Sequence, residues 1–354
     1  MSISDAAAVE LLTSLVGASS LCGQEDEVAE LLLAAMLAAG FAARRDEVGN
    51  VIGEFAPAKG DDRSPSVVLL GHLDTVPGTV PVEQRDGRLY GRGSVDAKGP
   101  LATAMVAAVR ARERARAGIT VIGAVQEEGP SVGARHLRRL AAPDYLIIAE
   151  PSGWDALVMG YKGSQRFTVS ITQPCTHSSV PEPTAAERAV ACWNALVLWS
   201  AQQGMPEKRD QFHSLTPTLI SMQSHSDGLH DTASLHIGLR LPPGIALAAV
   251  EHGVRAPLPE GDFCFSPGDL AVRGDKGNPL VTGFLRAVRA EGGTPRFKVK
   301  TGTSDMNVVG PVWQCPMLAY GPGDSRLDHT PDEHIRVDEY LQAIRVLTRV
   351  LEEL

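Results

Sequence analysis

The chain has 354 residues, of which 44% are hydrophobic and 21% are charged, and its formal net charge at pH 7 is −9. This length favours two domains over one core, and the negative charge argues against nucleic acid as the main partner, because nucleic-acid binding usually requires a basic face. No apolar stretch is long and uninterrupted enough to span a bilayer, so we expect no membrane partner.

Strand and helix patterns alternate in the first part of the chain. Helices are expected over residues 5–16, 24–39 and 101–117. Strands are expected over residues 48–55, 66–70, 119–125 and 145–149. We assign Asp5 as the N-cap of the first helix and Gly40 as the residue that ends the second. This alternation is typical of an α/β sheet with helices on both faces.

The pattern changes after Gly163. Strands are expected there over residues 166–172, 218–223, 234–241 and 262–265, and helices over residues 184–200 and 245–253. The resulting order βαββαβ is that of a ferredoxin-like sandwich. A helix over 280–291 and a strand over 296–300 return to the first pattern. We therefore expect a domain of residues 162–272 inserted into a larger domain made of residues 1–161 and 273–354.

His72 and Asp74 stand at the end of the apolar run SVVLL over residues 66–70. Open α/β sheets bind ligands outside the carboxyl ends of their strands, and side chains two residues apart point the same way. His72 is therefore a candidate metal ligand, with Asp74 placed to orient its ring. A histidine satisfied within the core would give the same pattern, so this pair alone leaves both interpretations open.

Further histidines and carboxylates follow other predicted strands or lie near the C-terminus. These are Asp96, Glu127, Glu128, Glu150, Asp328 and His329. Gathered at one rim, the carboxyl groups would have strongly raised pKa values unless a divalent cation lay among them. A mixed histidine and carboxylate set suits zinc, cobalt or manganese better than calcium or magnesium. If two metals share one carboxylate, Asp96 is the candidate bridge.

Glu127 and Glu128 are adjacent at the end of a predicted strand, so their side chains should point in opposite directions. One of them can bind metal while the other faces the substrate as a general base. The alternative is a solvated acidic pair at the start of a loop, which fits less well directly after an apolar strand.

Cysteine usage indicates the compartment. The cysteines are Cys22, Cys175, Cys192, Cys264 and Cys315. They are scattered, odd in number and never spaced as Cys-x-x-Cys, which argues against a disulfide framework and a structural zinc knuckle. The N-terminus has no basic segment followed by an apolar one. We therefore expect a cytoplasmic protein.

Several motifs together resemble the dinuclear zinc aminoacylase and carboxypeptidase family, which contains acetylornithine deacetylase, succinyl-diaminopimelate desuccinylase and glutamate carboxypeptidase. The motifs are GHLDTVPG, GRGSVDAKGP, QEEGPSVGA, AEPSG, THSS, TGTSD and LDHTPDE, in the family's order between residues 71 and 334. The resemblance implies a zinc-exopeptidase-like α/β catalytic domain with a mixed, largely parallel sheet between helices. It also implies that the inserted ferredoxin-like α+β domain is a lid and dimerisation domain.

The resemblance also implies two zinc ions per subunit, for which Co²⁺ could substitute. One ion would be held by His72, Asp96 and Glu150, and the other by Asp96, Glu128 and His329. Glu127 would be the general base, Asp74 would orient His72, and the peptide bond after Asp96 would be cis.

Residues of the inserted domain and of a late loop are implied to contact the substrate. His177, in THSS, would cross to the partner's active site in a homodimer and stabilise the oxyanion. Arg240 would meet a substrate carboxylate, although a surface salt bridge would explain this arginine equally well. The loop of Gly302, Thr303 and Ser304 would line the substrate pocket.

Within the family, VMGYKGSQRF, GLRLPPG and KTGTSDMNV most resemble the hydrolases that release lysine or ornithine from an amino-group carrier protein. The resemblance implies hydrolysis of the γ-glutamyl amide on this small acidic protein, in lysine or arginine biosynthesis. Acetylornithine deacetylation, succinyl-diaminopimelate desuccinylation and dipeptide hydrolysis are the alternatives, and a non-catalytic metal-binding scaffold is an alternative of another class. An acidic carrier would suit the arginines between residues 135 and 139, which a solvated helix face would also explain.

Overall fold

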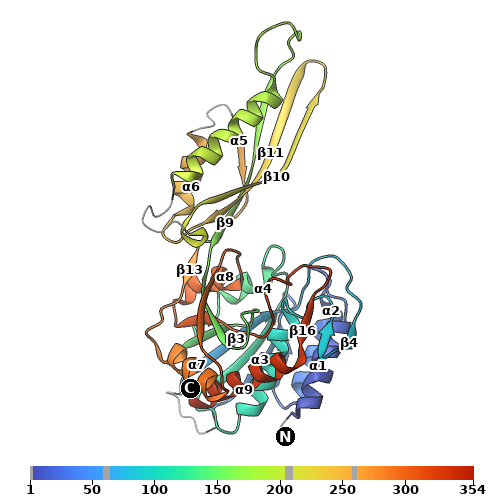
Figure 1. The fold of residues 1–354 in the computed structure, drawn as a ribbon, viewed down its shortest axis with the longest axis vertical. Helices are drawn as coiled ribbons and strands as arrows, with labels where there is room; N and C mark the ends of the chain where they lie inside the picture. The colour runs from blue at the N-terminus through green and yellow to red at the C-terminus, as the bar shows by residue number, and fades with distance from the viewer. Residues whose placement is uncertain (1–2, 59–63, 204–209, 257–260) are drawn as a thin grey trace. The chain divides into compact units, whose positions relative to one another are not determined.

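The computed structural model describes residues 3–58, 64–203, 210–256 and 261–354, which form two compact units (Figure 1). The larger unit comprises the described residues within 1–160, 274–299 and 304–354. The smaller unit comprises those within 161–273 and 300–303. Among the described residues, no helix is both long and apolar enough to cross a membrane.

A mixed β-sheet forms the centre of the larger unit. Its strands are β1 (Ala42–Arg45), β2 (Val51–Phe55), β3 (Ser66–His72), β6 (Gly118–Ala124), β7 (Tyr145–Ile148), β8 (Ala156–Tyr161) and β15 (Met317–Ala319). They follow the order β1-β2-β6-β3-β7-β15-β8. The neighbouring strands β6, β3, β7 and β15 are parallel, and antiparallel strands flank them on both sides. The predicted α/β class with a mixed sheet is confirmed.

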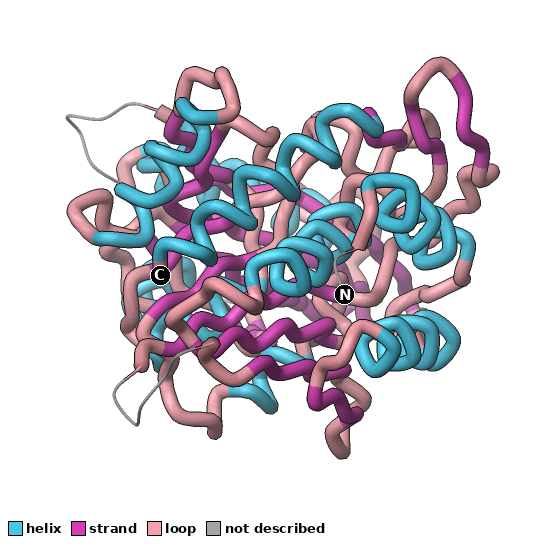
Figure 2. The backbone as a smooth tube through the Cα atoms, turned by 90° about the horizontal axis from the view of Figure 1, so that it is seen from below, coloured by secondary structure: helices cyan, strands magenta, loops and turns pink. Residues whose placement is uncertain are grey.

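Helices pack around this sheet, as the tube view in Figure 2 shows. They are α1 (Asp5–Gly17), α2 (Asp26–Ala38), α3 (Lys98–Ala111), α4 (Val132–Leu137), α7 (Pro279–Ala290), α8 (Asp305–Trp313) and α9 (Val337–Glu353). Helix α9 packs against α1, α3 and α7, and α1 also packs against α3. Helix α3 is buried on almost every side, which explains its run of alanine, valine and methionine: small apolar side chains let it pack closely between neighbours.

Several helix boundaries differ from the sequence-based expectation, among them those of α1, α2 and α3. The N-cap of α1 is Ser4, not Asp5, because the Ser4 hydroxyl accepts the N–H of Ala7 while Asp5 is already helical. Helix α2 begins after Glu25, because this carboxylate accepts the N–H of Gly23 and shapes a turn there. Helix α3 covers residues 98–111, where we expected 101–117.

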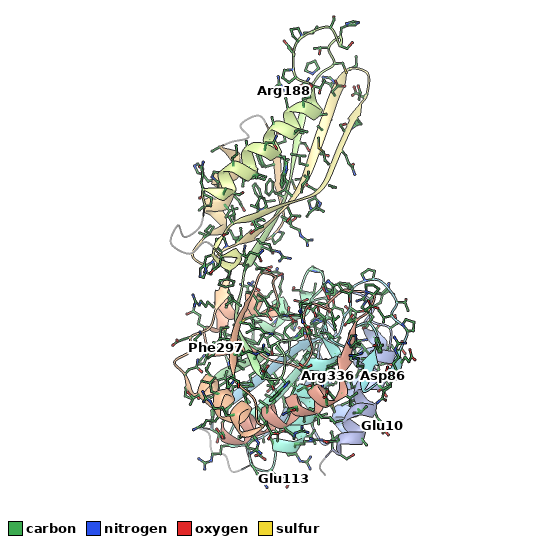
Figure 3. All side chains as sticks on the ribbon, in the orientation of Figure 1. Glu10, Asp86, Glu113, Arg188, Phe297 and Arg336 are labelled. Atoms are coloured by element: carbon green, nitrogen blue, oxygen red, sulfur yellow. The ribbon has the colours of Figure 1, made fainter. Side chains whose placement is uncertain are left out.

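The larger unit also contains a small antiparallel sheet with the order β16-β5-β4. Two loops that carry predicted metal ligands adjoin this sheet, one after β5 and one before β16. Its strands are β4 (Glu83–Arg85), β5 (Arg88–Tyr90) and β16 (His334–Arg336). Asp86 and Arg336, both labelled in Figure 3, mark the turn between β4 and β5 and the end of β16. Strand β5 leads directly into residues 91–97, and β16 begins five residues after His329.

The smaller unit has the element order βαββαβ and a sheet of order β10-β11-β9-β12 with antiparallel neighbours. Its elements are β9 (Gly163–Pro174), α5 (Ala185–Ala201), β10 (Thr216–Ser226), β11 (His230–Leu241), α6 (Leu247–Arg255) and β12 (Asp262–Phe265), with a 3₁₀ helix over Gln211–His213. This is a ferredoxin-like arrangement. Alternate residues of β9 and β11, such as Val169 and Ile237, are buried in one core with residues of α5 and α6. The chain passes between the units near β13 (Val272–Arg273) and β14 (Arg296–Lys300).

Candidate metal centre

His72 lies at the carboxyl end of β3 with its side chain 1% exposed. Its Nδ1 atom is 3.0 Å from the main-chain oxygen of Asp74 and 3.4 Å from the Asp74 carboxylate. When Nδ1–H donates to Asp74, the lone pair of Nε2 faces the carboxylates of Asp96, at 3.1 Å, and Glu150, at 3.6 Å. Asp74 is thus placed to hold the tautomer in which Nε2 can bind a cation.

Asp96 lies in the loop between β5 and α3, and a buried carboxylate to which the sequence patterns assigned no role, the last residue of LDHTPDE, contacts this loop. Glu333 is 0% exposed, and its Oε1 atom accepts the N–H groups of Gly93, Val95 and Asp96 at 3.0, 3.0 and 3.1 Å. Gly93 has a φ of 84°, which glycine adopts without strain. The peptide bond between Asp96 and Ala97 is cis. An acidic residue in a polar turn carries no sequence signal for this role.

The loop after β6 carries Glu127 and Glu128, and two further carboxylates hold its backbone. The Asp74 carboxylate accepts the N–H of Glu127 at 3.0 Å and that of Glu128 at 2.9 Å. Glu25 accepts the N–H of Gln126 at 3.2 Å, and Gln126 has the unusual φ of 62°. Asp74 therefore contacts both the ring of His72 and the loop that carries Glu127 and Glu128. The spacing of residues in the sequence predicts the first contact but not the second.

The structure brings the ligand candidates together in two groups that share Asp96. One group is His72, Asp96 and Glu150, and the other is Asp96, Glu128 and His329, each with its donor atoms within 4.8 Å of one another. His329 Nε2 lies 2.8 Å from Glu128 Oε1 and 3.1 Å from Asp96 Oδ2. Atoms bound at about 2.1 Å to one tetrahedral Zn²⁺ would lie roughly 3.4 Å apart. The donor set and its spacing therefore fit a divalent metal in each group after small adjustments.

The electrostatics of the groups are those of a cation site. Burial alone would lower the pKa of His72, but its hydrogen bonds to Asp74 and Asp96 raise that pKa well above the usual value. Hydrogen bonds to Asp96 and Glu128 raise the pKa of His329 to about 10. Both imidazoles thus face a strongly negative environment, in which a divalent cation can replace the protons.

Glu127 lies near these ligands but belongs to neither group. Burial raises its pKa well above the usual value; the positive charge of His72 opposes this rise, and the negative charges of Asp305 and Glu150 add to it. A carboxylate with a raised pKa is a better proton acceptor, as a general base requires.

The other predicted site residues lie elsewhere in the chain. His177 belongs to the smaller unit, on the exposed loop between β9 and α5, where its Nδ1 atom lies 2.8 Å from the Ser179 hydroxyl. Arg240, on β11, donates to the Thr303 hydroxyl at 3.2 Å, so these two predicted substrate contacts are neighbours. Gly302 lies beside Thr303, with open space where a Cβ would stand.

Ser304 has a local role in the larger unit. Its hydroxyl accepts the N–H of Met306 and caps α8, and Asn307 bonds back to the Ser304 N–H. This capping box explains a serine at this position without any substrate contact.

Comparison with known proteins places this arrangement in a family. The model of "Peptidase family M20/M25/M40" matches residues 68–353, a range that contains both ligand groups. The chain belongs to this family. It is 42% identical to a protein of Deinococcus radiodurans named "[LysW]-lysine hydrolase", over 98% of this chain and 97% of that protein. It is 29% identical to a "[LysW]-lysine/[LysW]-ornithine hydrolase" of Saccharolobus islandicus, over 81% of each chain.

Solved structures of the M20 family share the fold. An M20 family metallo-carboxypeptidase from Sulfolobus solfataricus matches 98% of this chain and 98% of its own, with a TM-score of 0.81 and 17% identity. The family match and the hydrolase relatives make the chain a hydrolase of a metal-dependent family, and it has candidate metal-binding groups at the carboxyl end of its sheet.

Proposed function

We propose that this M20 hydrolase releases lysine or ornithine from a carrier protein by hydrolysing the γ-glutamyl amide that joins them, in lysine or arginine biosynthesis. The observation that supports hydrolysis most directly is the pair of ligand groups sharing Asp96, with Glu127 at the same rim. The 42% identity to the Deinococcus radiodurans hydrolase, over almost the full length of both chains, supports the carrier-linked substrate.

We assign Zn²⁺ to both groups, with Co²⁺ as a functional substitute, because histidine and carboxylate ligands together suit these ions. Two such cations would acidify a water molecule and polarise the amide carbonyl. Glu127 takes the proton of the attacking water and delivers it to the leaving amine. Asp74 keeps Nδ1 of His72 protonated, so that Nε2 remains a ligand.

We further propose that the protein is a cytoplasmic homodimer in which His177 of one subunit stabilises the oxyanion at the other subunit's centre. The exposure of His177, whose Nδ1 atom contacts the hydroxyl of Ser179 two residues along, supports a role outside its own unit. All five cysteines are free thiols, as a reducing compartment would maintain. Arg240 and Thr303, which are in contact, are the candidates for binding a carboxylate of the substrate.

The function is tested by measuring amine release by the zinc-loaded enzyme before and after chelation. The substrates are carrier-linked γ-glutamyl-lysine, its ornithine counterpart, N-acetylornithine and N-succinyl-diaminopimelate. Chelator-sensitive turnover of the carrier conjugates alone is expected. Preference for acetylornithine would keep the metal centre but reject the carrier, and bound metal without turnover of any substrate would favour the scaffold alternative.

A further inference from the structure

Glu333 connects two segments of the larger unit that are far apart in the sequence. Its carboxylate is fully buried. The Oε1 atom accepts three main-chain N–H groups of the loop that carries Asp96, and Oε2 accepts Arg92 Nη1 at 2.7 Å. Arg92 in turn donates to the main-chain oxygen of Gly78. All four hydrogen bonds to this carboxylate thus come from residues 92–96.

The same residue belongs to the segment that carries His329. Glu333 follows His329 by four residues, and its main-chain oxygen accepts the N–H of Gly91 at 3.2 Å. Directly after it, β16 pairs with β5, His334 opposite Tyr90. Glu333 therefore joins the loop of Asp96 to the segment of His329, two ligands of one group.

In the other group only the shared ligand Asp96 depends on this connection. His72 ends β3, and Glu150 lies two residues after the end of β7, so both are placed by paired parallel strands. The N–H of Ala149 donates to the main-chain oxygen of Leu70 at 2.7 Å, which sets the spacing of the two strand ends. His329, by contrast, has a φ of 63° and lies in a turn, with its side chain 48% exposed.

We propose that Glu333 is a positioning residue that sets the metal affinity of the group Asp96, Glu128 and His329, with a much smaller effect on the group His72, Asp96 and Glu150. Glu333 acts by holding the Asp96 loop at a fixed distance from His329. This inference rests on the proposed two-metal centre. Residues that orient metal ligands typically change metal affinity by about 10–100-fold when they are removed.

The test counts bound Zn²⁺ per chain at graded, buffered concentrations of free Zn²⁺, with elemental analysis as the readout. The wild-type protein is expected to bind two ions. In Glu333→Ala the weaker step should shift to roughly 10–100-fold higher free Zn²⁺. The tighter step should move by less than about threefold, because the sheet still holds His72 and Glu150.

Two further variants separate positioning from general stability. Glu333→Gln keeps an oxygen that can accept the three N–H groups, so it should recover much of the lost affinity. Glu291→Ala removes a carboxylate that binds Arg345 and Arg349 elsewhere in the same unit, and should lower the melting temperature of the metal-free protein without changing either zinc-binding step.

The outcomes distinguish this inference from the function on which it rests. Fewer than two ions in the wild-type protein would reject the two-metal centre itself. Two ions in the wild type, with both steps weakened equally in Glu333→Ala or neither weakened, would reject the role of Glu333. A Glu333→Gln variant that binds zinc no better than Glu333→Ala would also reject it.

Discussion

The ligand loops of the larger unit and the His177 loop of the smaller unit differ in how they are held. Asp74, Glu25 and Glu333 are buried carboxylates that accept main-chain N–H groups of the loops bearing Glu127, Glu128 and Asp96. His177 is exposed, and its Nδ1 atom contacts the hydroxyl and the N–H of Ser179, two residues away.

This difference indicates where each region obtains its geometry. The geometry of the ligand loops is set by hydrogen bonds within the chain. Buried carboxylates must be satisfied by donors, and the main-chain N–H groups of these loops are the donors that satisfy them. The hydrogen bonds of His177 are local, and its side chain is exposed. A catalytic role for this residue therefore requires contact with a part of the protein outside its own loop. Substitutions in the two regions should therefore have different effects on zinc binding and turnover.

Replacing Glu127 by Gln removes the proposed proton acceptor while preserving shape. We expect kcat for amine release to fall by about 10²–10⁴-fold with bound zinc unchanged, because Glu127 is in neither ligand group. The matched control is Glu54→Gln, the same change at an exposed carboxylate on β2 that pairs with Arg44. Turnover near that of the wild type in Glu127→Gln would remove this residue from the role of base.

His177→Ala should lower kcat by roughly 100-fold through loss of one oxyanion donor, again with bound zinc unchanged. If His177 acts across a dimer, mixing subunits of His177→Ala with subunits of Glu127→Gln restores one intact centre per mixed dimer. The mixture should then recover roughly a quarter of wild-type turnover. Activity no higher than that of the two separate variants would contradict the crossing.

Asp74→Asn should lower zinc affinity or turnover by about 10–100-fold, because the amide cannot accept from both Glu127 and Glu128 while also facing His72. Asp227→Asn is the control. Asp227 also accepts two consecutive main-chain N–H groups, those of Leu229 and His230, but does so in a hairpin of the smaller unit. Equal effects of the two variants on zinc binding would show that Asp74 only stabilises the fold.

The smallest effect concerns Lys162, whose ammonium group donates to Gln211, Ser214 and Thr216 within the smaller unit. Burial, with the nearby charge of Arg240, lowers the pKa of Lys162 to about 8. Between pH 8 and its ordinary pKa of about 10.5, the unfolded chain therefore binds more protons here than the folded chain.

The folded wild-type protein should accordingly gain stability with rising pH in this interval, relative to Lys162→Met, by about 1 kcal/mol per pH unit. Denaturant unfolding in the presence of chelator measures this difference. A difference between the two proteins that stays constant from pH 8 to 10 would show that folding does not change the pKa of Lys162.

Sequence patterns predicted the α/β class, the order of elements in the inserted segment and most of the buried strands. These features depend on local periodicity: β3 and β6 are apolar runs bounded by turn residues, and β9 and β11 alternate buried and exposed positions. Helix α9 was not predicted, although its apolar positions recur with a helical period, so its pattern was available in the sequence. The prediction of Asp5 as the N-cap of α1 was wrong because Ser4 and Asp5 are both capping residue types. The backbone geometry makes Ser4 the N-cap.

The sequence by itself determined which residue types could hold a metal, because histidines and acids at the ends of apolar strands suit few other tasks. The division of the other ligands between two ions, and the lid and dimer roles of the smaller unit, rested on the family resemblance, and those lid and dimer roles remain predictions. Only the tertiary structure revealed the connections of Glu333 and Asp74. Glu333 joins segments more than 200 residues apart, and Asp74 joins segments more than 50 residues apart. Both do so through main-chain N–H groups, which every residue except proline carries. A main-chain donor leaves no trace in the sequence, so its acceptor can be identified only after the chain has folded.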